Sequence, residues 1–221
     1  MYYYMDSRME SHSVCPRIFI CGVSNTKAGI RRMKDYGDEQ FINLLRKRQE
    51  NSWNTDIRKG SVWRGGEELL FAEREIMKKR LWIWLPKNFS ILSKELALIK
   101  YPDNNCPDII YTDPATTVIV SFTQLKLKAG EEQKACASIE QQIRETYGDT
   151  SVRGTETLHA GEMEIPCLIS VTPALDAMVY NRMFFLPLDG KVCLGVCNCL
   201  EQDDWKELFV QMVTSVRVGS R

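Results

Sequence analysis

The sequence has no net charge, no long apolar run and little histidine. Its 29 lysines and arginines balance 29 aspartates and glutamates, which excludes a strongly basic nucleic-acid-binding protein. No run approaches the roughly eighteen apolar residues that a membrane-spanning helix needs, so we expect no membrane span. The 221 residues are 44% hydrophobic and 26% charged, which is typical of a globular protein and not of a disordered one.

The first residues lack the apolar core of a secretory signal. Asp6, Arg8 and Glu10 occupy the positions where that core would lie, and no apolar stretch precedes Cys15 to suggest a lipid anchor. Disulfides are not required either, because a chain of this length can bury a sufficient core without them. We therefore expect the eight cysteines to be reduced and the protein to be cytoplasmic.

Motifs for nucleotide binding or acyl transfer are incomplete. In Gly22–Gly29, Lys27 comes one position too early for a phosphate loop, and no hydroxyl residue follows it. The same stretch lacks the second glycine of a nucleophile elbow around Ser24. His12 and His159 are the available neutral-pH bases, and no pattern of neighbours marks either as catalytic. The sequence therefore predicts no catalytic residue and no cofactor-binding residue.

Basic residues gather in two clusters near the N-terminus, Lys27–Lys34 and Arg46–Arg48. Residues 1–75 nevertheless hold 13 basic and 11 acidic residues, so their net charge is 13 − 11 = +2. Nucleic-acid binding needs a concentrated positive face, and Trp53 and Trp63 could cover a sheet as well as stack on bases. Nucleic acid is therefore not an expected partner.

Three cysteines stand close together in the apolar segment Lys191–Cys199. On a strand, Cys193, Cys197 and Cys199 share one face, and Cys197 and Cys199, about 7 Å apart, could approach one metal ion. No fourth ligand is evident, so we predict no metal site and expect thiols that pack in a core. The opposite face is mostly apolar, which favours a central strand covered on both sides: Val192, Leu194, Val196 and Asn198.

Strand and helix patterns become regular after residue 69. Helices are expected at Ser93–Lys100, at Glu131–Tyr147 and from Asp203 onward, where Trp205 to Val216 form one apolar stripe. The expected strands are 70–76, 80–86, 108–112, 116–126, 153–159, 164–172, 177–186 and 191–199, with turns at Asp113-Pro114 and Asp189-Gly190. Runs of strands separated by single helices predict an α+β fold, an antiparallel sheet sandwiched by helices, and argue against a doubly wound nucleotide-binding fold.

The region before this pattern has few apolar residues. A helix is expected at Asp38–Glu50, and Asn51–Gly66 is polar and glycine-rich, which indicates a linker. We therefore divide the chain into an N-terminal extension, residues 1–66, loosely ordered or packed on the rest, and a main domain, residues 67–221.

The main domain carries marks of a known fold. They are Leu81–Phe89 (LWIWLPKNF), Ile99–Pro102, Pro107–Tyr111, Ile119–Phe122, Asp204–Trp205 and Thr214–Arg217. With the element order, they resemble the Mog1/PsbP-like fold over Glu73–Arg217, and the chain is similar to small uncharacterised bacterial proteins of that type. Members of the fold bind proteins, as a small-GTPase partner or a photosystem subunit, so the resemblance implies a non-enzymatic adaptor and transfers no functional residue.

Two functions remain open at this point. The first is a non-catalytic module that binds a protein partner or a small apolar ligand through a sheet face or groove. The alternative is a metal-binding or enzymatic protein that uses the Cys193, Cys197 and Cys199 strand. We expect the first, and we expect no cofactor.

Overall fold

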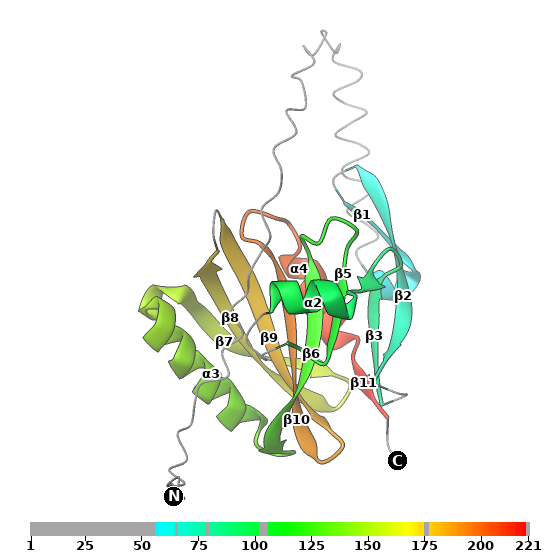
Figure 1. Ribbon diagram of the computed structural model, residues 1–221. Coiled ribbons are helices and arrows are strands. Elements are labelled where there is room, and N and C mark those ends of the chain that lie inside the picture. The colour runs from blue at the N-terminus through cyan, green and yellow to red at the C-terminus, as the bar shows by residue number, and fades with distance from the viewer. Residues whose placement is uncertain (1–55, 65, 78–79, 102–105, 175–176, 220–221) are drawn as a thin grey trace, which may run out of the picture.

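A computed structural model describes residues 56–64, 66–77, 80–101, 106–174 and 177–219. Figure 1 shows a large twisted sheet with helices against it and a smaller sheet beside it. The predicted helix Asp38–Glu50, the stretch Gly22–Gly29 and His12 lie outside the described residues.

The larger sheet has seven strands in the order β4-β5-β6-β10-β9-β8-β7, and every neighbouring pair is antiparallel. The bounds are β4 Ser90–Ile91, β5 Ile109–Thr112, β6 Ile119–Lys128, β7 Val152–Ala160, β8 Met163–Pro173, β9 Met178–Leu188 and β10 Lys191–Leu200. Asp189 and Gly190 join β9 to β10 with φ angles of 54° and 73°, as a tight hairpin turn with two left-handed residues requires. This turn fixes the register of the two central strands, with Lys191 opposite Leu188.

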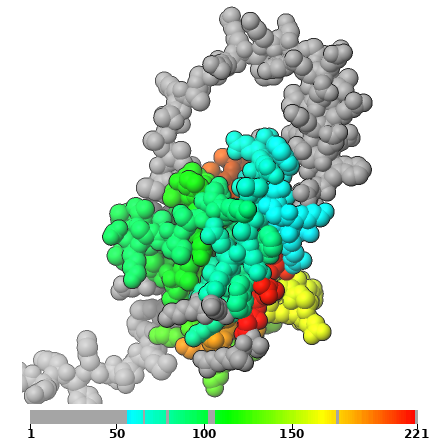
Figure 2. Space-filling model, turned by 90° about the vertical axis from the view of Figure 1, so that its right-hand side faces the viewer, coloured from blue at the N-terminus to red at the C-terminus, as the bar shows by residue number. Residues whose placement is uncertain are grey.

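The smaller sheet has four strands in the order β1-β2-β3-β11. They are β1 Ser61–Arg64, β2 Glu67–Ile76, β3 Leu81–Pro86 and β11 Arg217–Val218, and a 3-10 turn, η1 Ile57–Lys59, precedes them. Figure 2 views this side of the molecule, with the first strands in cyan and the C-terminal residues in red at the surface.

One expectation about this smaller sheet was wrong. The linker Asn51–Gly66 contains strand β1, because Val62 is buried and Ser61 to Arg64 pair along β2. The two faces of β3 differ in burial, since Leu81 is fully buried whereas Trp82 is half-buried. The guanidinium of Arg217 lies over the Trp82 ring at 5.5 Å instead of a protein layer.

Three helices of the described residues pack on the larger sheet: α2 Lys94–Lys100, α3 Glu132–Tyr147 and α4 Lys206–Thr214. The hydroxyl of Ser93 caps α2 by accepting from the Leu96 amide at 3.3 Å. Gly148, with φ 88°, ends α3 before the short turn η2 Asp149–Ser151. No helix among the described residues is long and apolar enough to cross a bilayer.

The larger sheet separates two apolar layers. One face, here called the outer face, is covered by α2 and α3 (Figure 1), and α3 buries an apolar stripe of Cys136, Ile139 and Ile143 there. The inner face packs against α4 and the smaller sheet in the main core. The predicted stripe of the last helix is buried in that core throughout: Trp205, Leu208, Phe209, Met212, Val213 and Val216. The observed architecture confirms the predicted antiparallel α+β class.

One charged side chain is buried on the inner face. Arg182 of β9 is 6% exposed, pairs with the Glu156 carboxylate of β7, and donates to the Tyr180 hydroxyl at 3.1 Å. Burial lowers the pKa of Arg182, and its Nε has no hydrogen-bond partner. The ion pair therefore links β7 to β9 across β8. The Glu156 carboxylate supplies the counter-charge for the buried guanidinium of Arg182.

Candidate partner-binding surface

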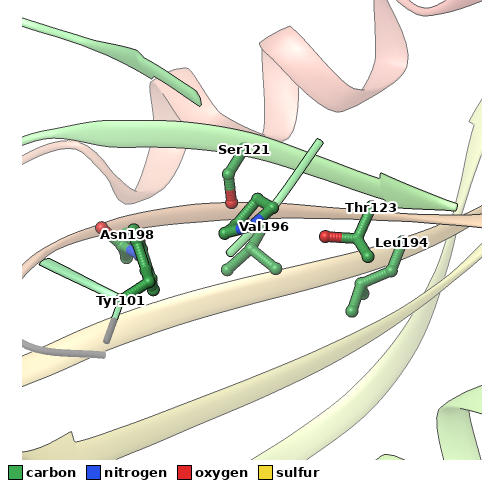
Figure 3. A pocket seen from close by; sticks show the side chains of 7 residues that line it. Tyr101, Ser121, Thr123, Leu194, Val196 and Asn198 are labelled. Atoms are coloured by element: carbon green, nitrogen blue, oxygen red, sulfur yellow. The ribbon is translucent and has the colours of Figure 1, made fainter. Parts of the chain in front are cut away.

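A shallow groove lies on the outer face over the strands β6 and β10, beside Tyr101, which follows the end of α2 (Figure 3). We call it the outer groove, and the residues that line it are Tyr101, Pro107, Ser121, Thr123, Leu194, Val196 and Asn198. Its cavity volume is about 20 Å³, which is room for one water-sized group and not for a whole organic ligand.

The strand registers bring the floor of the outer groove together. Val196 of β10 lies opposite Ser121 of β6, and Leu194 lies opposite Thr123. Directly opposed residues project from the same face of a sheet, so alternate residues of both strands point into the groove. Cys193, Cys197 and Cys199 have the other parity and point away from it.

Tyr101 forms the wall of the groove next to α2. Its side chain packs with Ala97, Ile110 and Ile119, which ties the end of α2 to β5 and β6. It is 4% exposed, and burial raises the pKa of its hydroxyl to about 12. Tyr101 is therefore a neutral hydrogen-bonding group at this wall, not a base or a nucleophile.

The helix beside this wall presents apolar side chains to solvent. Leu96 is 53% exposed, Leu98 62% and Ile99 75%, whereas Ala97 is the buried residue of α2. We call these three exposed residues the α2 apolar surface. Ile91 of the edge strand β4 is also 62% exposed, but it lies opposite Tyr111 of the main core and therefore projects from the other face of the sheet. A surface helix normally turns its apolar residues toward the core, so α2 has the opposite arrangement.

The α2 apolar surface and the outer groove adjoin each other. Tyr101, which lines the groove, directly follows the last residue of α2, so the groove lies at the C-terminal end of the helix that carries the apolar surface. Lys94 and Glu95 are exposed in the first turn of α2 and give the apolar residues a charged border. An apolar centre with a polar rim is the usual form of a protein-binding surface.

The cysteine strand is placed as its pattern predicted. Cys193, Cys197 and Cys199 lie on one face of β10 and are each 0% exposed in the main core, and the opposite face of the strand is buried as well. Burial raises the pKa of Cys193 and Cys199 to about 12, and raises that of Cys197. Metal binding and nucleophilic attack both need the thiolate, which this environment disfavours.

The described residues also hold no cluster of three or more histidine, cysteine or acidic side chains placed for a metal ion. His159, the remaining candidate base, is an exposed residue near the end of β7, opposite Glu164. The structure therefore brings neither group of sequence candidates into a chemical site.

Sequence reasoning missed the residues of the α2 apolar surface. The signal was present: Leu96–Ile99 is a run of four apolar residues on a seven-residue helix. A helix that lies on a sheet buries one stripe, so such a run cannot be covered on all sides. The residues Tyr101 and Asn198 came together only through the strand order, which the sequence pattern did not reveal.

No family model and no curated protein matches this chain. Among solved structures, it is similar to the cyanobacterial PsbP protein CyanoP from Synechocystis, with a TM-score of 0.51, 11% identity, and coverage of 71% of this chain and 97% of that one. It is less similar to LpqN, involved in cell envelope biogenesis of Mycobacterium tuberculosis, with a TM-score of 0.42, 9% identity, and coverage of 69% and 92%.

A third similar structure is the immunity protein TplEi from Pseudomonas aeruginosa, complexed with an "L" peptide. Its TM-score is 0.36 at 12% identity, with coverage of 84% of this chain and 86% of that one. The TM-scores of LpqN and TplEi are below 0.5, so the fold assignment rests on CyanoP. The chain has the PsbP-like fold, as the element order predicted.

Proposed function

We propose that the protein is a non-catalytic binding module that engages a protein partner through the α2 apolar surface. The observation that carries the proposal is the exposure of three large apolar side chains on one short helix: Leu96, Leu98 and Ile99. Covering a fully exposed side chain of this kind contributes about 1.5–3 kcal/mol, so a partner that covers all three gains a substantial part of its binding energy there. Protein binding also agrees with what the resemblance to PsbP-like proteins implies.

A protein partner fits this surface better than a small apolar ligand does. Pockets for organic ligands are concave and measure about 300–1,000 Å³. The outer groove has a cavity volume of about 20 Å³, and the apolar residues beside it stand on a convex helix. A second protein can cover a convex apolar surface, whereas a small molecule would remain exposed to water on one side.

We further propose that the protein acts in the cytoplasm with its thiols reduced. The described residues include six cysteines, and all of them are free thiols. Five of the six are buried, where burial raises the thiol pKa and suppresses oxidation: Cys136, Cys167, Cys193, Cys197 and Cys199.

The test replaces two residues of the α2 apolar surface in the full chain, Leu98→Glu with Ile99→Glu. The matched control is Leu70→Glu, because Leu70 is 44% exposed on β2, far from α2 in the chain and in the other sheet. Tagged proteins are used for quantitative affinity capture from a lysate of the source organism, and their melting temperatures are compared. Sedimentation velocity shows whether the chain self-associates instead.

We expect the wild type and the Leu70→Glu variant to retain the same partner, and the double variant to lose it with an unchanged melting temperature. Equal recovery by all three proteins would contradict the proposal. A dimer of the wild type that the double variant abolishes would identify a second copy of the chain as the partner.

A further inference from the structure

A second exposed apolar surface lies at the β1 end of the smaller sheet. Trp63 of β1 and Leu70 of β2 are each 44% exposed, and we call them the β1-β2 apolar surface. Trp63 lies opposite Glu68, and Leu70 lies opposite Ser61. Opposed residues and alternate residues of one strand share a face, so all four project from the same side. Val62 projects from the other side and is buried in the main core.

Charged side chains of both signs border this surface. Glu68, directly opposite Trp63, and Glu67, at the end of β2, are exposed. Lys87 is exposed at the other border, where its amide donates to the Leu70 carbonyl at 2.7 Å. The β1-β2 apolar surface therefore has an acidic end beside Trp63 and a basic end beside Leu70.

The described part of the chain enters the fold next to this surface. Asp56 precedes the 3-10 turn η1, which leads directly into β1. Gly60 ends this turn, and its carbonyl accepts from the Phe71 amide at 2.8 Å, so the turn lies beside the residue that follows Leu70. A segment that ends a few residues before Asp56 therefore needs only a short connection to cover Trp63 and Leu70.

Residues 38–50, the helix expected from the sequence, carry the complementary pattern. Phe41, Leu45 and Arg48 are spaced by four and three residues, which places them along one side of a helix. The segment has an acidic start and a basic end: Asp38, Glu39, Arg46, Lys47 and Arg48. Residues 49–55 connect it to Asp56, and a stretch of this length spans at most about 25 Å.

We propose that residues 38–50 pack as a helix on the β1-β2 apolar surface. Phe41 and Leu45 cover Trp63 and Leu70, and the basic end of the segment lies beside Glu68. The apolar contact supplies most of the stability, because an exposed ion pair contributes little, and the charges set the direction of the helix. The chain thus covers this surface itself, whereas the proposed protein partner uses the α2 apolar surface.

The test is limited trypsin digestion of the full chain, because the segment carries a cleavage site after Arg46. The rate of this cut, followed by mass spectrometry, is divided into the rate for a synthetic peptide of the same sequence, which gives a protection factor. Leu70→Glu and Phe41→Glu disrupt the two sides of the contact. The matched control Leu98→Glu makes the same change on α2, and melting temperatures show whether each variant is folded.

We expect at least tenfold protection in the wild type and in Leu98→Glu, and less than twofold protection in Leu70→Glu and Phe41→Glu. No protection in the wild type, or equal protection in all four proteins, would overturn the proposal. A loss of protection in Leu98→Glu alone would place the segment on the α2 apolar surface and would overturn it as well.

A charge exchange tests the direction of the helix. Arg48→Glu and Glu68→Arg each bring like charges together, so each should lower the protection about two- to fivefold. The double variant restores an opposite pair and should regain the protection of the wild type. A double variant that is less protected than either single variant would refute the stated direction.

Discussion

The ring of Phe184 on β9 lies over Gly195, the residue directly opposite it on β10. A Cβ atom at position 195 would overlap three atoms of that ring. Phe122 lies opposite Gly195 on the other side, and the two rings meet edge to face with centroids 6.0 Å apart. Because Gly195 has no side chain, Phe184 and Phe122 can touch in the centre of the core although their strands, β9 and β6, are not adjacent.

Gly195→Ala is expected to destabilise the protein by about 3 kcal/mol or more, because the added methyl must displace a fully buried ring. Urea denaturation at neutral pH measures the loss. Phe184→Leu should relieve the overlap, so the double variant should be more stable than the sum of the single losses predicts. Strict additivity would show that the ring does not occupy the glycine position.

Phe209→Ala should cost about 3–5 kcal/mol, as is usual for removing a large buried aromatic side chain. Phe209 is fully buried in α4 and stacks between Trp205 and Tyr180, with centroids 6.0 and 6.3 Å away. Val210→Ala is the control on the same helix, since Val210 is only half-buried. A loss below 1 kcal/mol for Phe209→Ala would mean that α4 is not anchored in the main core.

The buried pair of Arg182 and Glu156 should respond unequally to the removal of its two members. Glu156→Gln leaves the Arg182 guanidinium buried without a counter-charge and should be clearly destabilising. Arg182→Met removes the buried charge itself and should cost less, or stabilise the protein. The melting temperatures of the two variants test this expectation. A smaller loss of stability for Glu156→Gln than for Arg182→Met would contradict it.

Stability should fall at alkaline pH because of the buried thiols. Burial raises the pKa of Cys193 from 9.0 to about 12, so between these values the folded protein keeps a proton that the unfolded chain releases. The contribution of this thiol to the free energy of unfolding is complete below pH 9. It is lost as the pH rises toward 12, at about 1.4 kcal/mol per pH unit.

The check is Cys193→Val, whose free energy of unfolding should fall less steeply than that of the wild type between pH 9 and 10.5. Below pH 8 the two curves should run parallel, which makes that range the internal control. Identical slopes above pH 9 would mean that this thiol ionises in the folded protein.

We propose that the folded unit includes Asp56–Arg64 and does not begin at Glu67. Ile57 and Val62 are 1% and 6% exposed, and the Ile57 amide donates to the Gln211 side chain of α4 at 3.0 Å. A chain that starts at Glu67 should melt several degrees below one that starts at Asp56, or should aggregate. Equal melting temperatures for both chains would place the boundary at Glu67 instead.

Local patterns allowed much of this fold to be predicted. The Asp189-Gly190 turn needs two left-handed residues, and the alternation along Lys191–Cys199 correctly placed three cysteines on one covered face. The Asp113-Pro114 turn was equally local, because the Asp113 carboxylate accepts from the amides of Thr117 and Val118 at 2.8 Å. Signals of this kind depend on residues that are close in the chain.

The features that were missed depend on distant residues. Strand β11 exists because Arg217 and Val218 meet Trp82 and Leu81, and two residues carry no strand pattern of their own. The buried polar residues Asn198, Asn181 and Ser170 could not be recognised as neighbours for the same reason, since they meet only through the strand order. The exposure of α2 is different, because its signal was local: a run of four apolar residues on a short helix cannot be covered on all sides by one sheet.

The bulge at the start of β7 has a consequence for self-association. β7 is the nine-residue edge of the larger sheet, and its register shifts between Val152 and Gly154. Its outward side chains are exposed and polar or charged: Arg153, Thr155, Thr157 and His159. A kinked, charged edge is a poor template for a strand of another molecule, so this border resists the sheet-to-sheet growth that leads to fibrils. At the opposite border, β4 has only two residues, and the apolar side chains beside it are carried by a helix, which cannot propagate a sheet.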